Sequence, residues 1–214
     1  DWARQGENSY SRLSSYAWLG LALIEEGRYQ EARATLNQGL VQAADLDESH
    51  LLQVRMLNML AYLHREIGDL EAARAYSLQA LAAGKRRADG DNIEATCYAL
   101  LELATTAIHQ GQTADAAPYI REFESLSNRS TDYIHFKYMN RYGLLQTELA
   151  LAQGLFEEAL AQSTATRQDA QQTELHKNVV KCRGVADRVD LDEGEQGAAL
   201  QAAPGPKVLA DTIA

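Results

Sequence analysis

Four side chains that can form several hydrogen bonds recur at spacings of 3, 4 and 3 residues: Arg55, Asn58, Tyr62 and Arg65. These spacings place all four on one face of a helix. An asparagine can bind an extended peptide backbone through both its donor and its acceptor, and an arginine can hold a carboxylate through two parallel hydrogen bonds. We therefore hypothesise that this face binds an acidic or C-terminal peptide. The alternative is a set of ordinary exposed residues whose arginine stems cover the helix surface.

Catalytic and metal-binding patterns are not found in the sequence. No two of the five histidines lie four residues apart, and none belongs to an HExxH motif or a Cys/His cluster: His50, His64, His109, His135 and His176. The phosphate-binding and nucleophile motifs GxxxxGK[ST], GxGxxG and GxSxG are also missing. We therefore expect no enzyme, no metal and no cofactor. An enzyme that uses scattered histidines and carboxylates is the least favoured reading.

Composition narrows the possible partners further. A net charge of −10 argues against a nucleic-acid binder, which needs a basic surface, and against docking on an anionic membrane. No apolar run approaches the ~18 residues of a membrane span, and no secretion signal opens the chain. Cys97 and Cys182 lie in apolar contexts and have no CxxC partner, so we expect free thiols and a cytoplasmic protein. The chain begins in mid-pattern, so we expect it to be part of a longer protein.

The elements that position these residues are predicted from an internal repeat. Gly27, Gly68, Gly111 and Gly154 follow one another at intervals of 41, 43 and 43 residues. Five residues after each glycine stands an alanine, and eight residues before it stand Leu19, Leu60, Leu103 and, as a weaker match, Gln146. Apolar residues recur at helical intervals on both sides of each glycine, which predicts two amphipathic helices joined by a left-handed turn. Such hairpins bury their apolar faces only by stacking.

The expected fold is all-α, a right-handed α-solenoid of about four helix-turn-helix repeats with an irregular C-terminal cap. We place the solenoid at residues 1–170, with repeats at about 10–44, 50–84, 92–126 and 132–170. Residues 171–214 are predicted to be a degenerate capping repeat or a tail, because Pro204 and Pro206 forbid a complete second helix there.

The residues Trp18, Leu19, Gly20, Gly27, Tyr29, Ala32 and Leu36 resemble the tetratricopeptide repeat family. That family repeats every ~34 residues. The longer spacing here is similar to the long-repeat variants of bacterial signalling and transcription regulators, and the resemblance covers about residues 10–170. The stretch "LDEGEQGAAL" also resembles the segment that follows the repeats in large LuxR-type activators.

This resemblance implies that the first helix of each repeat lines a concave groove. The implied groove residues include Arg55, Asn58, Tyr62 and Arg65 in the second repeat, with Tyr98, Thr105, Arg141 and Glu148 in the two that follow. The implied function is a non-catalytic protein-interaction module that binds a peptide or protein segment, as a regulatory or scaffold part of a larger bacterial protein. The alternative is a sensor domain for a small effector or signalling peptide. The oligomeric state stays open.

Overall fold

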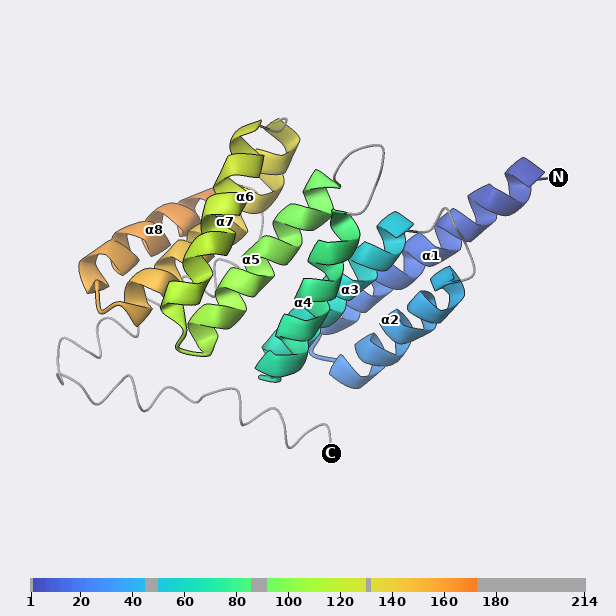
Figure 1. Cartoon of the computed structure of the whole chain (residues 1–214), viewed down its shortest axis with the longest axis horizontal. Helices are drawn as coiled ribbons and strands as arrows, with labels where there is room; N and C mark the ends of the chain where they lie inside the picture. The colour runs from blue at the N-terminus through green and yellow to red at the C-terminus, as the bar shows by residue number, and fades with distance from the viewer. Residues whose placement is uncertain (1, 45–49, 86–91, 130–131, 173–214) are drawn as a thin grey trace. The chain divides into compact units, whose positions relative to one another are not determined.

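Eight helices, arranged as four helix-turn-helix hairpins, make up the part of the chain that the structure describes (Figure 1). This computed structural model describes residues 2–44, 50–85, 92–129 and 132–172. Those residues contain no β-strand, which confirms the predicted all-α helical-repeat solenoid. The helices are α1 (Trp2–Glu25), α2 (Tyr29–Ala44), α3 (His50–Glu66), α4 (Leu70–Gly84), α5 (Ile93–His109), α6 (Thr113–Arg129), α7 (Asp132–Ala152) and α8 (Phe156–Gln172).

The four spaced glycines form the turns within the hairpins, as predicted. Their φ angles lie in the left-handed region: 76° at Gly27, 80° at Gly68, 74° at Gly111 and 73° at Gly154. At the second turn the Gly68 amide donates to the Arg65 carbonyl at 3.0 Å, and the Asp69 amide donates to the His64 carbonyl at 2.9 Å. This pair of bonds is the Schellman motif, which satisfies the last carbonyls of a helix. The same pair recurs at the other three glycines.

Small residues bring the helices close together. The alanines five residues after each turn glycine are fully buried: Ala32, Ala73, Ala116 and Ala159. Between hairpins, a Cβ atom added at Gly39 of α2 would lie 2.5 Å from Met56 Sδ of α3 and 2.8 Å from Tyr16 Cβ of α1. Only a residue without a side chain therefore fits where α2 meets both first helices.

Replacing Gly39 with alanine is expected to lower the free energy of unfolding by about 1–2 kcal/mol. Overpacking costs about 1–3 kcal/mol, because the Tyr16 Cβ cannot move without its backbone, and improved helix propensity offsets at most about 1 kcal/mol. Urea unfolding followed by circular dichroism measures the change. The control is Gln38→Ala, at the neighbouring exposed position of α2. Equal stability of the Gly39→Ala variant and the natural chain would contradict the close approach.

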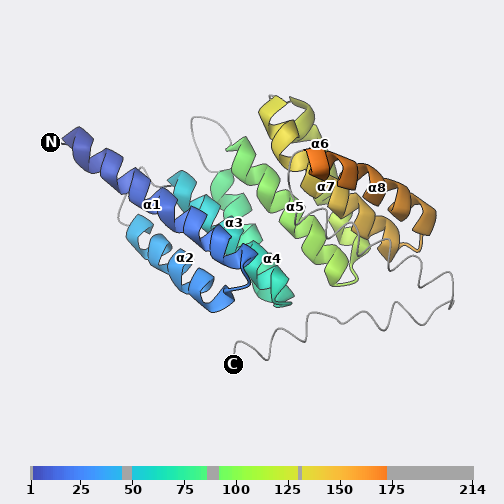
Figure 2. The same cartoon turned by 180° about the vertical axis from the view of Figure 1, so that it is seen from behind.

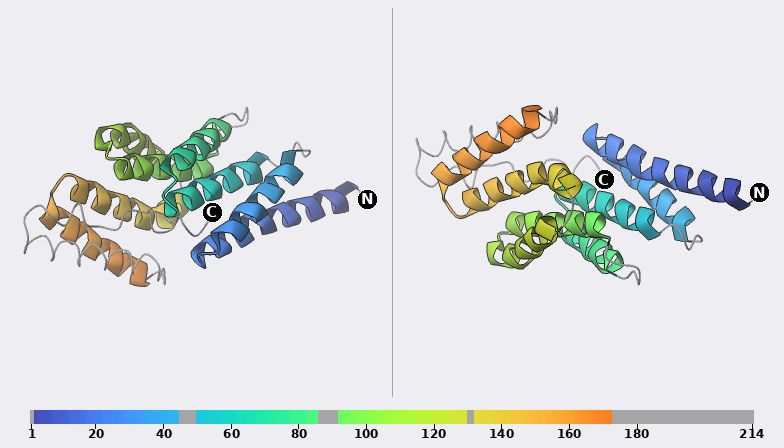
Figure 3. Two further views of the ribbon diagram at one scale, coloured as in Figure 1. Left: turned by 90° about the horizontal axis from the view of Figure 1, so that it is seen from below. Right: turned by 90° about the horizontal axis from the view of Figure 1, so that it is seen from above.

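The described residues divide into two compact units, and the division falls within α5. The first extends to Leu103, and within it α1 packs on α2, α3 packs on α4, and α3 also contacts both α1 and α2 (Figures 2 and 3). The second begins at Ala104, and within it α7 packs on α8 and contacts α6.

The bounds of the helices do not test the predicted domain limits. α1 begins at Trp2, earlier than the predicted start of the first repeat near residue 10. α8 ends at Gln172, close to the predicted limit of the solenoid at residue 170. The predicted cap or tail at residues 171–214 lies almost wholly outside the described residues, so it stays a prediction.

Candidate functional site

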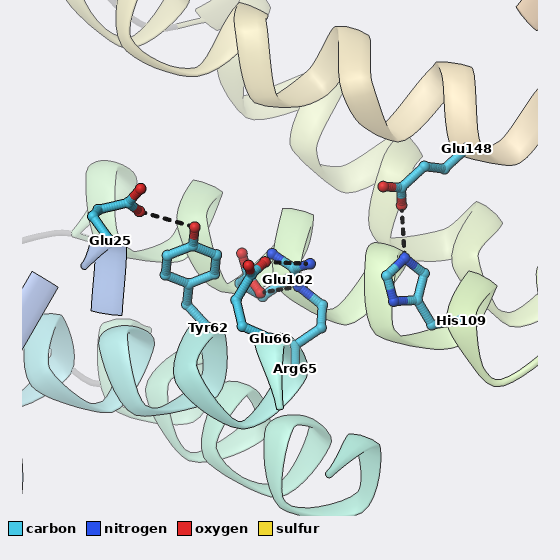
Figure 4. A network of polar contacts seen from close by, with 7 residues as sticks. All are labelled: Glu25, Tyr62, Arg65, Glu66, Glu102, His109 and Glu148. Carbon is cyan, nitrogen blue, oxygen red and sulfur yellow. Dashed lines mark hydrogen bonds and ion pairs between the residues drawn. The ribbon is translucent and has the colours of Figure 1, made fainter. Parts of the chain in front are cut away.

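The predicted polar face of α3 lies against the first helices of the neighbouring hairpins. On one side, the Tyr62 hydroxyl donates to Glu25 Oε1 of α1 at 2.9 Å (Figure 4). On the other, Arg65 Nε donates to Glu102 Oε2 of α5 at 2.9 Å. Consecutive first helices in the first unit are thus connected by side-chain hydrogen bonds between residues 37 positions apart.

Arg65 and Glu102 form a buried ion pair. Arg65 is 8% exposed and Glu102 is 2% exposed. A second contact joins Arg65 Nη1 to Glu66 at 3.2 Å, and the guanidinium carbon lies 5.2 Å from the centre of the Tyr62 ring. Buried charges of this kind are stable only when their partners stay in place. Arg65 therefore holds α3 and α5 together.

Asn58 also lies between helices. Its side chain is 2% exposed, and its Nδ2 donates to the Ala95 carbonyl of α5 at 3.1 Å. The amide that could have bound a peptide backbone is thus bonded to the backbone of the next hairpin. Its proposed role in partner binding stays a prediction, and the observed contact is structural.

Arg55 is the most accessible of the four predicted residues. Its side chain is 22% exposed, and its Nη2 lies 3.4 Å from Glu94 Oε1 of α5, longer than a typical charge-assisted hydrogen bond. The guanidinium carbon also lies 5.6 Å from the centre of the Trp18 ring of α1, within the range of a cation–π interaction. Trp18 itself is 55% exposed. Arg55 therefore has an oriented guanidinium beside an accessible aromatic ring.

Carboxylates outnumber guanidiniums around this face. Arg55 and Arg65 are accompanied by four acidic side chains in the first unit: Glu25, Glu66, Glu94 and Glu102. The positive charge that the sequence suggested for this face is therefore balanced by carboxylates, most of them on the neighbouring helices. A strongly acidic ligand would meet repulsion here, whereas a single carboxylate at Arg55 would replace one that is already present.

In the second unit, His109 of α5 contacts Glu148 of α7, with 2.9 Å between Nε2 and Oε2 (Figure 4). His109 stands two residues before its turn glycine and Glu148 stands six residues before the next. Glu25 and Tyr62 occupy these same two repeat positions. The same two repeat positions are therefore in contact in both units, but the residue types that form the contact differ.

The other predicted groove residues are at most partly accessible. Tyr98 is buried, and Thr105 and Arg141 are half-buried. Partner binding by these three, and by Glu148, is not decided by their positions and stays a prediction.

Tyr142 of α7, next to Arg141, belongs to a compact polar group in the second unit. Its hydroxyl donates to Glu124 of α6 and accepts from Gln146 Nε2 at 2.6 Å, while its ring stacks on Phe123 with centroids 5.2 Å apart. Burial, followed by the hydrogen bond to Glu124, raises the pKa of Tyr142 to about 12. The group connects α6 to α7.

The raised pKa of Tyr142 predicts a loss of stability at high pH. An unfolded tyrosine releases its proton near pH 10, so the contribution of neutral Tyr142 is complete below that pH and is lost as the pH rises from about 10 to about 12. We expect the tyrosinate absorbance of the folded chain to contain a component near pH 12 that Tyr142→Phe removes. A titration in which the variant and the natural chain coincide would contradict this environment.

Sequence reasoning did not pair the polar face of α3 with its contacts Trp18, Glu25, Glu94 and Glu102, nor His109 with Glu148. Each of the polar contacts joins residues 37 or 39 positions apart. These separations are four to six residues shorter than the spacing of the turn glycines, which is about one to two helical turns, as expected when equivalent helices lie side by side with a small shift. A search for complementary side chains at that separation would have found them.

The described residues bear on two further kinds of function, metal binding and membrane insertion. No three histidine, cysteine, aspartate or glutamate side chains gather there in a group that could hold a metal ion. None of the helices described is both long and apolar enough to cross a membrane.

Comparison with protein families gives a match over the first part of the chain. The family model for the tetratricopeptide repeat matches residues 11–86, which comprise most of the first two hairpins. The third and fourth hairpins lie outside that match but have the same left-handed turn glycine and buried alanine. No curated protein matches the chain.

Proposed function

We propose that this chain binds a protein segment on the face of its first helices, with Arg55 and Trp18 as the contact point. The support is that residues 11–86 match the family model of the tetratricopeptide repeat. Tetratricopeptide repeats mediate protein–protein interactions, and an all-α repeat fold is typical of a non-catalytic interaction module. Which face binds the partner, and what kind of ligand it binds, are the parts that we propose.

The observation that carries this proposal is the arrangement of Arg55, Trp18 and Glu94. The contact between Arg55 and Glu94 is long, at 3.4 Å, and both side chains are partly exposed. A partly exposed ion pair with so long a contact is weakly held, so a ligand carboxylate can replace Glu94 at small cost. Trp18 holds the guanidinium in place beforehand, which lowers the entropy lost on binding. Aromatic and arginine side chains are also the usual anchors of protein interfaces.

The charge of the face favours a single carboxylate over an acidic run. Glu25, Glu66 and Glu102 lie further along the same face, against Tyr62 and Arg65, so a ligand with a long run of negative charge would meet them. A C-terminal carboxylate supplies one negative charge at the end of a chain and can be held through two parallel hydrogen bonds. We therefore favour the C-terminal form of the predicted peptide ligand.

The remaining predicted residues have supporting roles in this proposal. Asn58, Tyr62 and Arg65 fix the relative positions of α1, α3 and α5, on which the position of Arg55 depends. We extend the proposed face to Tyr98, Thr105, Arg141 and Glu148 as secondary contacts. Alanine at these four positions is expected to weaken binding less than alanine at Arg55.

An array of short peptides with free C-terminal carboxylates, each paired with its C-terminal amide, tests the proposal. We expect binding to the free-acid members, and Arg55→Ala to weaken it at least about tenfold, the effect of losing a charged hydrogen bond. The matched control is Arg74→Ala on the exposed face of α4. Equal binding of acid and amide peptides, or equal effects of the two alanine variants, would contradict the proposal.

We further propose that the chain serves as a regulatory or scaffold part of a larger bacterial protein. The support is the long repeat of 41–43 residues, which resembles that of bacterial regulators. The full-length gene tests this: an adjoining ATPase or DNA-binding domain supports it, and a gene that encodes only these repeats contradicts it.

A further inference from the structure

The ion pair of Arg55 and Glu94 is accessible at both of its charges. The two side chains are 22% and 27% exposed, whereas those of the Arg65–Glu102 pair are 8% and 2% exposed. The proposed function uses only the positive member, because the carboxylate of a peptide terminus binds Arg55 in place of Glu94. Glu94 keeps its negative charge beside the bound ligand. The pair therefore presents a second charged group to the residue in which the ligand ends.

Glu94 is held near Arg55 by the backbone contacts of its neighbour Ala95. Glu94 lies in the first turn of α5, where the Ala95 amide donates to Asn92 Oδ1 at 3.2 Å. The Ala95 carbonyl accepts a hydrogen bond from Asn58 Nδ2 of α3 at 3.1 Å. The start of α5 is thus tied to the helix that carries Arg55. When a ligand binds Arg55, the carboxylate of Glu94 therefore stays within side-chain reach of it.

The charges of this pair favour a ligand that carries both signs. A ligand with only a carboxylate gains one ion pair and separates another. A terminal lysine or arginine supplies both charges in one residue, so its carboxylate can bind Arg55 while its side-chain cation binds Glu94. Lysine carries its ammonium on a long flexible stem, and arginine matches a carboxylate through two hydrogen bonds. Since Arg55 and Glu94 are already in contact, one residue can reach both, and each protein charge keeps a partner of opposite sign.

The charge of the whole chain favours the same kind of ligand. The chain has a net charge of −10, so its field attracts a cation and opposes the approach of an anion. A terminal lysine or arginine balances its own carboxylate with its side chain. A terminal aspartate or glutamate instead brings two negative charges to a site where only Arg55 can be given up by its present partner at small cost.

We propose that the protein segment bound by this chain ends in a lysine or an arginine with a free carboxylate. In this arrangement Glu94 recognises the side-chain cation of the last residue, while Arg55 binds its carboxylate. The inference rests on the proposed function, since it concerns the same site and adds the identity of the last residue. It makes Glu94 the residue that determines specificity for that side chain.

Peptides of one sequence that differ only in the last residue test the proposal. That residue is lysine, its uncharged analogue norleucine, or glutamate, each as free acid and as amide, and titration calorimetry with the full chain measures the affinities. We expect the lysine free acid to bind about fivefold more tightly than the norleucine free acid, the effect of one partly exposed charged hydrogen bond. The glutamate free acid is expected to bind most weakly of the three.

Two substitutions of Glu94 identify the group that makes this selection. Glu94→Gln is expected to reduce the preference for lysine to less than about twofold, while the difference between acid and amide peptides remains. Glu94→Lys is expected to reverse the preference, so that the peptide ending in glutamate binds more tightly than the one ending in lysine. The matched control is Glu71→Gln, which removes a carboxylate from the first turn of α4 as Glu94→Gln does from that of α5. Circular dichroism verifies that all three variants fold.

The possible results separate this inference from the proposed function. Free-acid peptides that bind through Arg55 without a preference for lysine would overturn the role of Glu94 and leave the proposed function standing. A preference that survives Glu94→Gln as well as it survives Glu71→Gln would do the same. Equal binding of the acid and amide forms would contradict the proposed function, and this inference with it.

Discussion

Replacing Glu102 with alanine is expected to lower the free energy of unfolding by about 3 kcal/mol, the largest effect of any single polar substitution considered. The change leaves the guanidinium of Arg65, which is 8% exposed, without its main partner. Loss of one member of a buried ion pair costs about 3–5 kcal/mol. Glu66 keeps one contact with Arg65, so the value falls at the lower end of that range. Urea unfolding measures the change.

A paired substitution separates the ion pair from the space that it fills. The double variant Arg65→Met/Glu102→Leu removes both charges and retains most of the side-chain volume, so we expect a stability within about 1 kcal/mol of the natural chain or above it. If Glu102→Ala were as stable as the natural chain, the pair could not be buried between α3 and α5 as described.

Leu60→Ala and Leu19→Ala are expected to differ greatly although the two leucines occupy the same repeat position. Leu60 is fully buried, and removing such a side chain costs about 2–5 kcal/mol through lost burial and the cavity left behind. Leu19 is about half exposed, and its removal is expected to change stability by no more than about 0.5 kcal/mol. Thermal and urea unfolding of the two variants give the comparison.

The leucine comparison tests the difference in burial between these two positions of α1 and α3. Large and equal losses at both positions would mean that Leu19 is covered in solution. Small and equal losses would mean that α3 is not packed between its neighbours. Only the unequal result agrees with an exposed Leu19 and a buried Leu60.

The fold was predictable from the sequence because each repeat has the same backbone requirement. A left-handed turn needs glycine, and the close crossing of two helices needs a small residue five positions later. Gly154 and Ala159 therefore marked the fourth hairpin even where Gln146 replaced the expected leucine. Such requirements are local, so they are visible in one short stretch and can be found again along the chain.

The chemistry of the polar face was less predictable, because it depends on residues far away in the sequence. The spacing of Arg55, Asn58 and Arg65 predicted that they share one face of a helix. It did not predict which residues that face contacts. In a stacked repeat the face of one first helix borders the next first helix, so most of its hydrogen-bonding groups are used between hairpins. Arg55 remains the accessible member because its contact with Glu94 is long and lies beside an exposed tryptophan.

These contacts have a consequence for how the module would respond to a partner. Displacing Glu94 from Arg55 would leave the buried pair of Arg65 and Glu102 intact, so under the proposed function the first helices would keep their register. Binding is therefore expected to require little reorganisation of the first unit. Arg55 and Arg65, which look equivalent in the sequence, are assigned different roles on this basis.

Fluorescence of Trp18 during peptide titration is the most direct test of the proposed binding face. The chain has two tryptophans, so a Trp2→Phe variant leaves Trp18 as the only reporter. The probes are the peptides of the array described above, each as free acid and as amide. We predict a saturable change in Trp18 emission with the free-acid peptides, lost in Arg55→Ala and retained in Arg74→Ala. Peptide binding that leaves Trp18 emission unchanged, or that survives Arg55→Ala, would contradict the account.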